Sequence, residues 1–173
     1  MSEHKEEYEL ESGSKLTPVK EFRVYRRNLL HREDPGNAYS ITFRTATGYS
    51  LTDAAKDITF DTIKFHADKK YKLYACVVMK THVHIILLPL EESKDNFFSL
   101  AQIMHSIKSY SANKIQRTLN KKGSVWLNEN YDRIVRDADD YLEKINYVIF
   151  NPVKAGLVGE SKDYKWLYYE GSG

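Results

Sequence analysis

Two histidines separated by one residue stand at the start of an apolar run in the stretch THVHIILLP, residues 81–89. Side chains two apart on a strand project from the same face, about 6.5–7 Å apart along the chain, so His82 and His84 would point the same way. Two imidazoles at this spacing can converge on one metal ion. The spacing also suits a pair of hydrogen-bonded strand histidines, and a third ligand would distinguish the two interpretations.

A polar stripe near the C-terminus offers further candidates. In the run YLEKINYVIFN, residues 141–151, helical spacing gathers the apolar side chains on one side. Tyr147 and Asn151 lie off that apolar side and four residues apart, so they are neighbours on the helix surface. This puts a phenol beside an amide oxygen that can coordinate a hard cation. Position alone does not separate Tyr147 from an ordinary surface tyrosine, because the chain has 13 tyrosines.

The strands that would position the histidines follow from residue periodicity. Apolar residues alternate with polar ones over residues 38–46, which predicts a strand with one buried face. Two β-branched and aromatic runs, at 71–79 and 82–88, predict an antiparallel hairpin. A further extended segment is expected at 125–135, with Trp126 in the core.

Three helices are expected between and after these strands. Apolar residues at helical spacing predict helices over 51–69 and 97–121. The last helix would carry residues 141–151 and be stopped by Pro152, because the residue before a proline disfavours the helical region.

The order strand, helix, strand, strand, helix, strand, helix is that of a ferredoxin-like split βαβ arrangement with an extra C-terminal helix. The sequence therefore predicts the α+β class, with an antiparallel sheet and helices. One domain is expected over residues 20–168. It would follow a disordered tail at 1–19, whose Glu, Ser and Lys residues bury too little apolar surface to become ordered, and precede a flexible tail at 169–173.

Composition narrows the class of protein. A chain of 173 residues with 42% hydrophobic content fits one globular domain. The single cysteine, Cys76, lies in an apolar run, and no signal-like segment stands near the N-terminus, so neither disulfides nor secretion is indicated. No apolar segment approaches the roughly 20 residues that cross a bilayer, so no membrane partner is expected. A cytoplasmic protein is the expectation.

The formal net charge of +2 is too small to indicate a nucleic-acid partner, but its distribution is informative. Residues 101–122 contain no acidic side chain, and a second basic segment precedes the first strand. Lysine and arginine in both segments can neutralise phosphates, although each segment taken singly fits an ordinary solvated basic face equally well. The candidate DNA-binding residues are Arg23, Arg26, Arg27, His31, Lys108, Lys114, Arg117, Lys121 and Lys122.

Three blocks in this order carry a resemblance to a known family: THVHIILLP, VWLNENYDRIVRD and INYVIFNPVKAGLV. With the leading RRNLLH and YSITFRTA, they resemble the REP-associated tyrosine transposases, a branch of the HUH single-tyrosine transposases, over residues 26–168. Members often carry a proline and a polar residue before the histidines, where this chain has Lys80-Thr81. They also carry proline in an early LPH motif, where this chain has Leu29-Leu30-His31.

The resemblance implies an enzyme that binds hairpin-containing single-stranded DNA, nicks it and transfers strands through a covalent 5′-phosphotyrosine. His82 and His84 match the metal pair, Asn151 the third metal-coordinating position, and Tyr147, on the extra helix, the nucleophile. The implied cofactor is Mg²⁺ or Mn²⁺, with no nucleotide cofactor. The implied partner is single-stranded or hairpin DNA, bound by a monomer or homodimer in the bacterial cytoplasm and associated with the nucleoid.

Other functions stay open. A catalytically silent protein could bind hairpin DNA or RNA on the same fold, although a pure binder would not need all four chemical positions. A metal-dependent hydrolase could use water instead, and Tyr147 would then be dispensable. Tyr110 is the rival nucleophile, since it also lies on a helix beside basic residues, but Ile103 and Ile107 nearby predict that it lies in or at the boundary of the core.

Overall fold

The computed structural model describes residues 36–171, and a five-stranded antiparallel sheet lies at its centre. The predicted tail at 1–19 and four predicted DNA contacts, Arg23, Arg26, Arg27 and His31, lie outside the described residues. The strand order is β6-β1-β3-β2-β7. The strands are β1 (Tyr39–Thr45), β2 (Tyr71–Val78), β3 (His82–Pro89), β6 (Trp126–Ile134) and β7 (Leu167–Tyr169).

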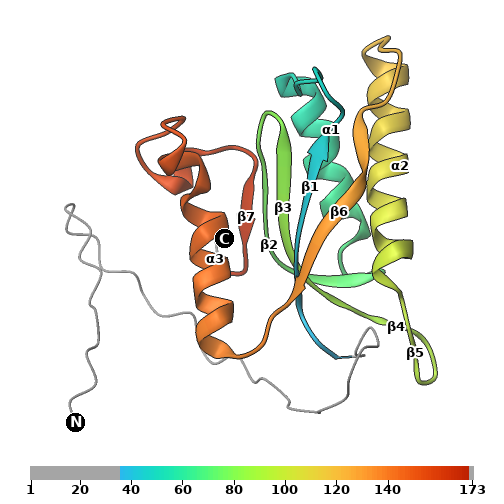
Figure 1. Ribbon diagram of the computed structural model, residues 1–173, viewed down its shortest axis with the longest axis vertical. Coiled ribbons are helices and arrows are strands. Elements are labelled where there is room, and N and C mark those ends of the chain that lie inside the picture. The colour runs from blue at the N-terminus through green and yellow to red at the C-terminus, as the bar shows by residue number, and fades with distance from the viewer. Residues whose placement is uncertain (1–35, 172–173) are drawn as a thin grey trace.

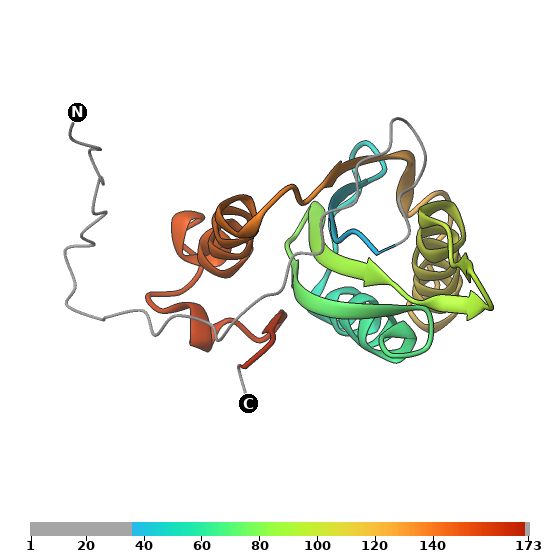
Figure 2. The same cartoon turned by 90° about the horizontal axis from the view of Figure 1, so that it is seen from below.

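Helices cover both faces of this sheet, as Figures 1 and 2 show. Helices α1 (Asp53–His66) and α2 (Leu100–Thr118) pack on each other on one side, and α1 contacts β2. Helix α3 (Ala138–Lys154) lies on the other side, against β2, β3 and β7. Strands β1 and β2 run parallel with β3 between them, and β3 and β6 run parallel with β1 between them. This is the split βαβ arrangement, so the predicted α+β class and ferredoxin-like sheet are confirmed.

The helices begin where polar side chains can accept hydrogen bonds from otherwise unpaired backbone N–H groups. The Thr52 hydroxyl accepts from Ala55 N at the start of α1. Ser99 and Gln102 form a reciprocal capping box at the start of α2. Asp137 caps α3 by accepting from the backbone N–H of Asp140 at 2.9 Å.

The prediction that Pro152 ends the last helix is wrong, because α3 continues to Lys154. Pro152 has no N–H to donate, but the next turn closes normally: Ala155 N donates to Asn151 O at 3.0 Å, and Leu157 N donates to Pro152 O at 3.0 Å. The buried proline ring packs within the domain, and this packing outweighs the lost bond. Asn151 therefore lies inside the helix, one turn beyond Tyr147.

Three short strands were not predicted. Strands β4 (Glu91–Ser93) and β5 (Asn96–Phe97) form a small hairpin before α2. Strand β7 pairs with β2 and extends the sheet beyond the four predicted strands, and its last residue, Tyr169, lies within the predicted flexible tail at 169–173. The adjacent Trp166 is buried, and its indole N–H donates to Asp57 at 2.8 Å.

Trp126 ties the edge strand β6 to the helical layer. It is 5% exposed, as the sequence predicted for a core residue, and its ring meets that of Phe43 edge-on at 4.9 Å. The indole N–H donates to Ser111 on α2 at 3.0 Å. Within residues 36–171, none of the helices has the length and apolar character needed to span a bilayer.

Candidate active site

The predicted site residues meet between the sheet and α3. His82 and His84 lie on β3, opposite Arg44 and Thr42 of β1, and their ring centroids are 4.9 Å apart. The Tyr147 ring, carried by α3, stands nearly perpendicular to the His84 ring, with centroids 5.1 Å apart. Because α3 packs on the sheet face from which His84 projects, segments far apart in sequence come together here.

One ring nitrogen of His84 lies within hydrogen-bond distance of a partner, and the other has no partner among the described residues. Its Nδ1 lies 2.7 Å from the Thr42 hydroxyl, whereas its buried Nε2 has no hydrogen-bond partner among the described residues. Burial, together with nearby His82 and Arg44, lowers the pKa of His84 to about 4. The ring is therefore neutral at physiological pH, and a neutral imidazole is the form that binds a metal ion.

His82 brings Asn151 into the site. A side-chain hydrogen bond joins the two residues, and the Thr81 hydroxyl lies 3.3 Å from Nδ1 of His82. Burial and the nearby Arg44 lower the pKa of His82, and the bond to Asn151 only partly offsets that effect. The structure thus gathers all four predicted chemical positions, while their roles in catalysis stay predictions.

Tyr147 borders an open hollow of about 450 Å³ between α3 and the β1–β6 edge of the sheet. Its side chain is 49% exposed, so a large substrate can reach it. The hollow includes residues that local sequence patterns do not indicate, because their place beside the histidines depends on strand register. They are Thr42, Phe43, Arg44, Leu127, Glu129, Asn130 and Tyr131.

The donor atoms fit a divalent metal ion. His84 Nε2 is buried with no partner in the described chain, and His82 and Asn151 add a second imidazole and an amide oxygen next to it. Among residues 36–171, no group of three or more histidine, cysteine, aspartate or glutamate side chains is arranged to hold a metal. Beside the two imidazoles, the Asn151 amide oxygen is the further donor of a type that can coordinate such an ion.

Comparison with known proteins supports the family named by the sequence motifs. No family model matches the chain. A REP-associated tyrosine transposase of Haemophilus influenzae is 24% identical over 136 residues, covering 75% of this chain and 76% of the relative. One from Escherichia coli is 23% identical over 126 residues, covering 73% and 71%. The solved structure of a REP-associated tyrosine transposase bound to a REP hairpin matches with a TM-score of 0.62 and 21% identity, over 84% of this chain and 82% of that one.

This chain resembles the REP-associated tyrosine transposases in sequence and in fold.

One departure from the motifs of these transposases lies next to the histidines. Lys80 and Thr81 form the tight turn between β2 and β3, closed by a 2.8 Å bond from Met79 N to His82 O. The carbonyl oxygens of both turn residues accept backbone hydrogen bonds: Leu51 N donates to Lys80 O, and Thr45 N donates to Thr81 O. The turn is therefore fixed from both sides without the proline common in the family.

The start of α3 is locked to the chain that leads out of β6. Asp140 is buried, and its carboxylate accepts from Arg136 N at 2.9 Å and pairs with Lys144. Burial alone would raise the pKa of Asp140, but the bonds from Lys144 and Arg136 hold it below its ordinary value. This junction fixes where α3, and with it Tyr147, lies over the sheet.

The predicted basic residues on α2 and just after it lie on the other side of the sheet from Tyr147. Lys114, Arg117, Lys121 and Lys122 are exposed, whereas Lys108 reaches across to β6. They are therefore not part of the hollow.

Tyr110 also lies on α2 and packs on α1. It is not a core residue, because it is 48% exposed, but its ring stacks on Phe65 of α1 with centroids 6.1 Å apart, which fits the boundary position that was the other expectation. It has no place beside His84, whose neighbours across the sheet face come from β1 and α3.

Proposed function

We propose that this protein nicks and rejoins single-stranded DNA beside hairpins, with Tyr147 as the nucleophile. The names of its relatives support a transposase-like role. The observation that carries the finer proposal is the contact of the Tyr147 ring with His84, whose buried Nε2 lacks a partner in the described chain. A phenol beside a metal-capable imidazole pair is suited to attack on a phosphodiester.

In the proposed reaction, the Tyr147 oxygen forms a bond to phosphorus and the bond to the 3′ oxygen breaks. The phenol proton passes to solvent, to which Tyr147 is open, and the leaving oxygen takes up a proton as a 3′-hydroxyl. The 5′ end stays linked to the protein. Since the link conserves the phosphodiester bond energy, a second 3′-hydroxyl can attack it and join new strands, which suits transposition better than degradation.

The side chains around Tyr147 have distinct tasks in this scheme. Thr42 orients His84 through its contact with Nδ1. An Mg²⁺ or Mn²⁺ ion held by His82, His84 and Asn151 would supply Lewis-acid stabilisation of charge on the phosphate. Arg44, at the rim of the hollow, is placed to attract the DNA backbone.

The proposed partner is hairpin DNA, in line with the hairpin bound in the solved structure of similar fold. Action on DNA would take place in the bacterial cytoplasm, with the protein bound at the nucleoid. Either a monomer or a homodimer fits the proposal.

The test is formation of a covalent adduct. Labelled hairpin DNA with single-stranded flanks is incubated with the protein and Mg²⁺ or Mn²⁺, then separated under denaturing conditions. We expect a protein–DNA band that Tyr147→Phe abolishes and that Tyr110→Phe retains. Tyr110 is a matched control, because it is 48% exposed against 49% for Tyr147 and also lies on a helix.

Each contrary outcome has a meaning. An adduct that persists in Tyr147→Phe refutes the nucleophile assignment. If the wild-type protein binds several hairpins but never forms an adduct, the catalytically silent binding protein becomes the better description. Cleavage without an adduct, unaffected by Tyr147→Phe, indicates hydrolysis by water.

A further inference from the structure

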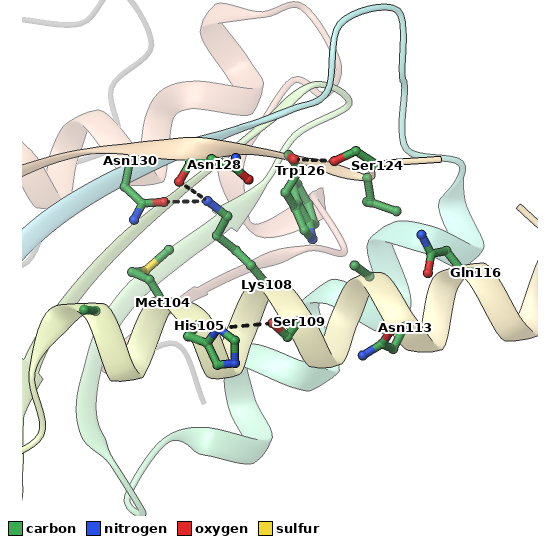
Figure 3. Close-up of a pocket in the computed structure, with 13 residues that line it drawn as sticks. Met104, His105, Lys108, Ser109, Asn113, Gln116, Ser124, Trp126, Asn128 and Asn130 are labelled. Carbon is green, nitrogen blue, oxygen red and sulfur yellow. Dashed lines mark hydrogen bonds between the residues drawn. The ribbon is translucent and has the colours of Figure 1, made fainter. Parts of the chain in front are cut away.

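A polar groove of about 530 Å³ runs between α2 and β6, on the far side of β6 from α3. Figure 3 shows Lys108 extending from α2 to the strand, with Asn128 and Asn130 above it and Asn113 and Gln116 further along the helix. The lining spans α2 from Ala101 to Gln116, about 22 Å at 1.5 Å per residue. The groove is therefore long enough for several residues of an extended chain.

The chemistry of this groove favours a polyanion with hydrogen-bonding edges. None of its lining residues is acidic, and amide side chains, which both donate and accept hydrogen bonds, contribute much of it. The exposed lysines and arginine at the end of α2 extend the positive charge beyond Gln116. Amides suit base edges and sugar oxygens, and lysine suits phosphates.

Lys108 brings a positive charge into the groove. Its ammonium donates to Asn128 O at 2.9 Å and to Asn130 Oδ1 at 3.0 Å, both neutral acceptors. Among residues 36–171 it forms no ion pair with a carboxylate. A partly buried cation without a counter-ion favours binding of an anion such as a phosphate.

The groove and the hollow beside Tyr147 share one lining residue. Asn130 lines both cavities, one from each side of β6. Because β6 is the edge strand of the sheet, a chain that leaves Tyr147 can cross this edge at Asn130 and enter the groove. The Asn130 side-chain oxygen accepts a hydrogen bond from Lys108. The NH₂ group of the same side chain remains a donor at the point where the DNA would cross the strand.

The edge of β6 is less suited to pairing with a β-strand of another protein than to binding a polyanion. Asn128 falls where the register between β1 and β6 is irregular, and Lys108 already occupies its carbonyl oxygen. An irregular, lysine-covered edge is the kind that resists strand addition.

We propose that the α2–β6 groove binds the single-stranded flank of the DNA substrate whose scissile phosphate lies at Tyr147. This inference rests on the proposed function and adds the path of the substrate. The flank passes over β6 at Asn130, with a phosphate at Lys108 and its bases or sugars along Asn113 and Gln116.

The test compares two DNA probes in a background that cannot cleave. Both are fluorescein-labelled hairpins, one with no more than a stub of flank and one with a thymidine flank of about 12 nucleotides, within the usual site size of single-strand binders. Anisotropy titrations use the full chain carrying Tyr147→Phe. The groove variants are Lys108→Met and Asn113→Glu, and the matched controls on α1 are Lys64→Met and Ala54→Glu, both at exposed positions.

We expect each groove variant to weaken binding of the long-flank probe about 5–10-fold, and of the short-flank probe less than about 2-fold, since one charge contact is lost or opposed. Lys108→Met should also reduce the salt slope of long-flank binding by about 0.7, the value for one phosphate contact on a single strand. The α1 controls should bind both probes as the parent does.

The proposal is overturned if the groove variants lose the same affinity for both probes, or if they lose no affinity for either. It is also overturned if the flank effect is absent and Asn113→Glu changes the sedimentation of the protein, because the groove would then be a contact between copies. Failure of the proposed function looks different: the wild-type protein then forms no adduct, whatever the flank dependence of binding.

Discussion

The hydrogen bond between Thr42 and His84 allows a quantitative test of the proposed metal site. Thr42→Val keeps the branched shape that suits a strand but removes the hydroxyl that lies 2.7 Å from His84 Nδ1. Without it, His84 loses the partner that fixes its tautomer and ring orientation. A partner of this kind typically contributes about 10–100-fold to metal affinity or activity.

Two free energies are expected to change in Thr42→Val. Loss of one partly buried hydrogen bond should lower the unfolding free energy by about 1 kcal/mol, since such bonds contribute roughly 0.5–1.5 kcal/mol net. For a chain of this size that is a fall in Tm of about 3–4 °C. Mn²⁺ affinity should fall at least about 10-fold, which is about 1.4 kcal/mol of binding free energy.

The assay is calorimetric titration of Mn²⁺ into wild-type protein, Thr42→Val and a control, with thermal unfolding of each. Thr59→Val is the control, because Thr59 is buried on α1 and its hydroxyl donates to Ala55 O at 2.8 Å, away from the histidines. It should lose similar stability and keep the wild-type affinity. If Thr42→Val is folded and binds Mn²⁺ as tightly as the control, Thr42 does not orient a metal ligand and the reasoning fails.

Three further predictions concern the junction, the core and the metal. Asp140→Asn should lower the unfolding free energy by about 1–3 kcal/mol at pH 7, because Lys144 and the Arg136 N–H lose a buried carboxylate. Since the folded pKa of Asp140 is depressed, this difference should shrink as pH falls below about 4, and urea titrations that show it constant down to pH 3 would contradict the assignment. Trp126→Phe should cost about 1–3 kcal/mol through the lost bond to Ser111 and the smaller ring, with an unchanged Tm as the contrary result. Chelation by EDTA should stop adduct formation and added Mn²⁺ should restore it, whereas full activity in EDTA would exclude metal dependence.

Local rules place the four candidate chemical positions in two pairs, and their roles stay predictions. The two-residue period of a strand places His82 and His84 on one face, and the helical period places Tyr147 and Asn151 together. Thr42 and Arg44 could not be selected in the same way. They lie on the polar face of β1, but only the pairing of β1 with β3 sets Thr42 opposite His84 and Arg44 opposite His82.

Tertiary packing explains the other differences. The rule that a helix stops before proline failed at Pro152, because the buried ring and the bonds of the following turn keep α3 intact. Strand β7 has only three residues, and its partner β2 lies far earlier in the sequence. No local pattern therefore predicts this strand. Tyr110 lies near an apolar stripe by spacing, yet α1 covers only part of that stripe and leaves the ring half exposed.

The histidines and Tyr147 of the candidate site are positioned by different parts of the fold. The histidines belong to β3, which is paired on both edges, so their positions follow the sheet. Tyr147 belongs to α3, whose start depends on the Asp140 junction. A small shift of α3 changes the distance from the Tyr147 oxygen to a phosphate beside the histidines, and in-line attack is sensitive to about 1 Å. Asp140→Asn should therefore slow adduct formation even where the protein remains fully folded. Mn²⁺ binding should change less, because the sheet positions two of the three proposed ligands, His82 and His84, and α3 carries only Asn151.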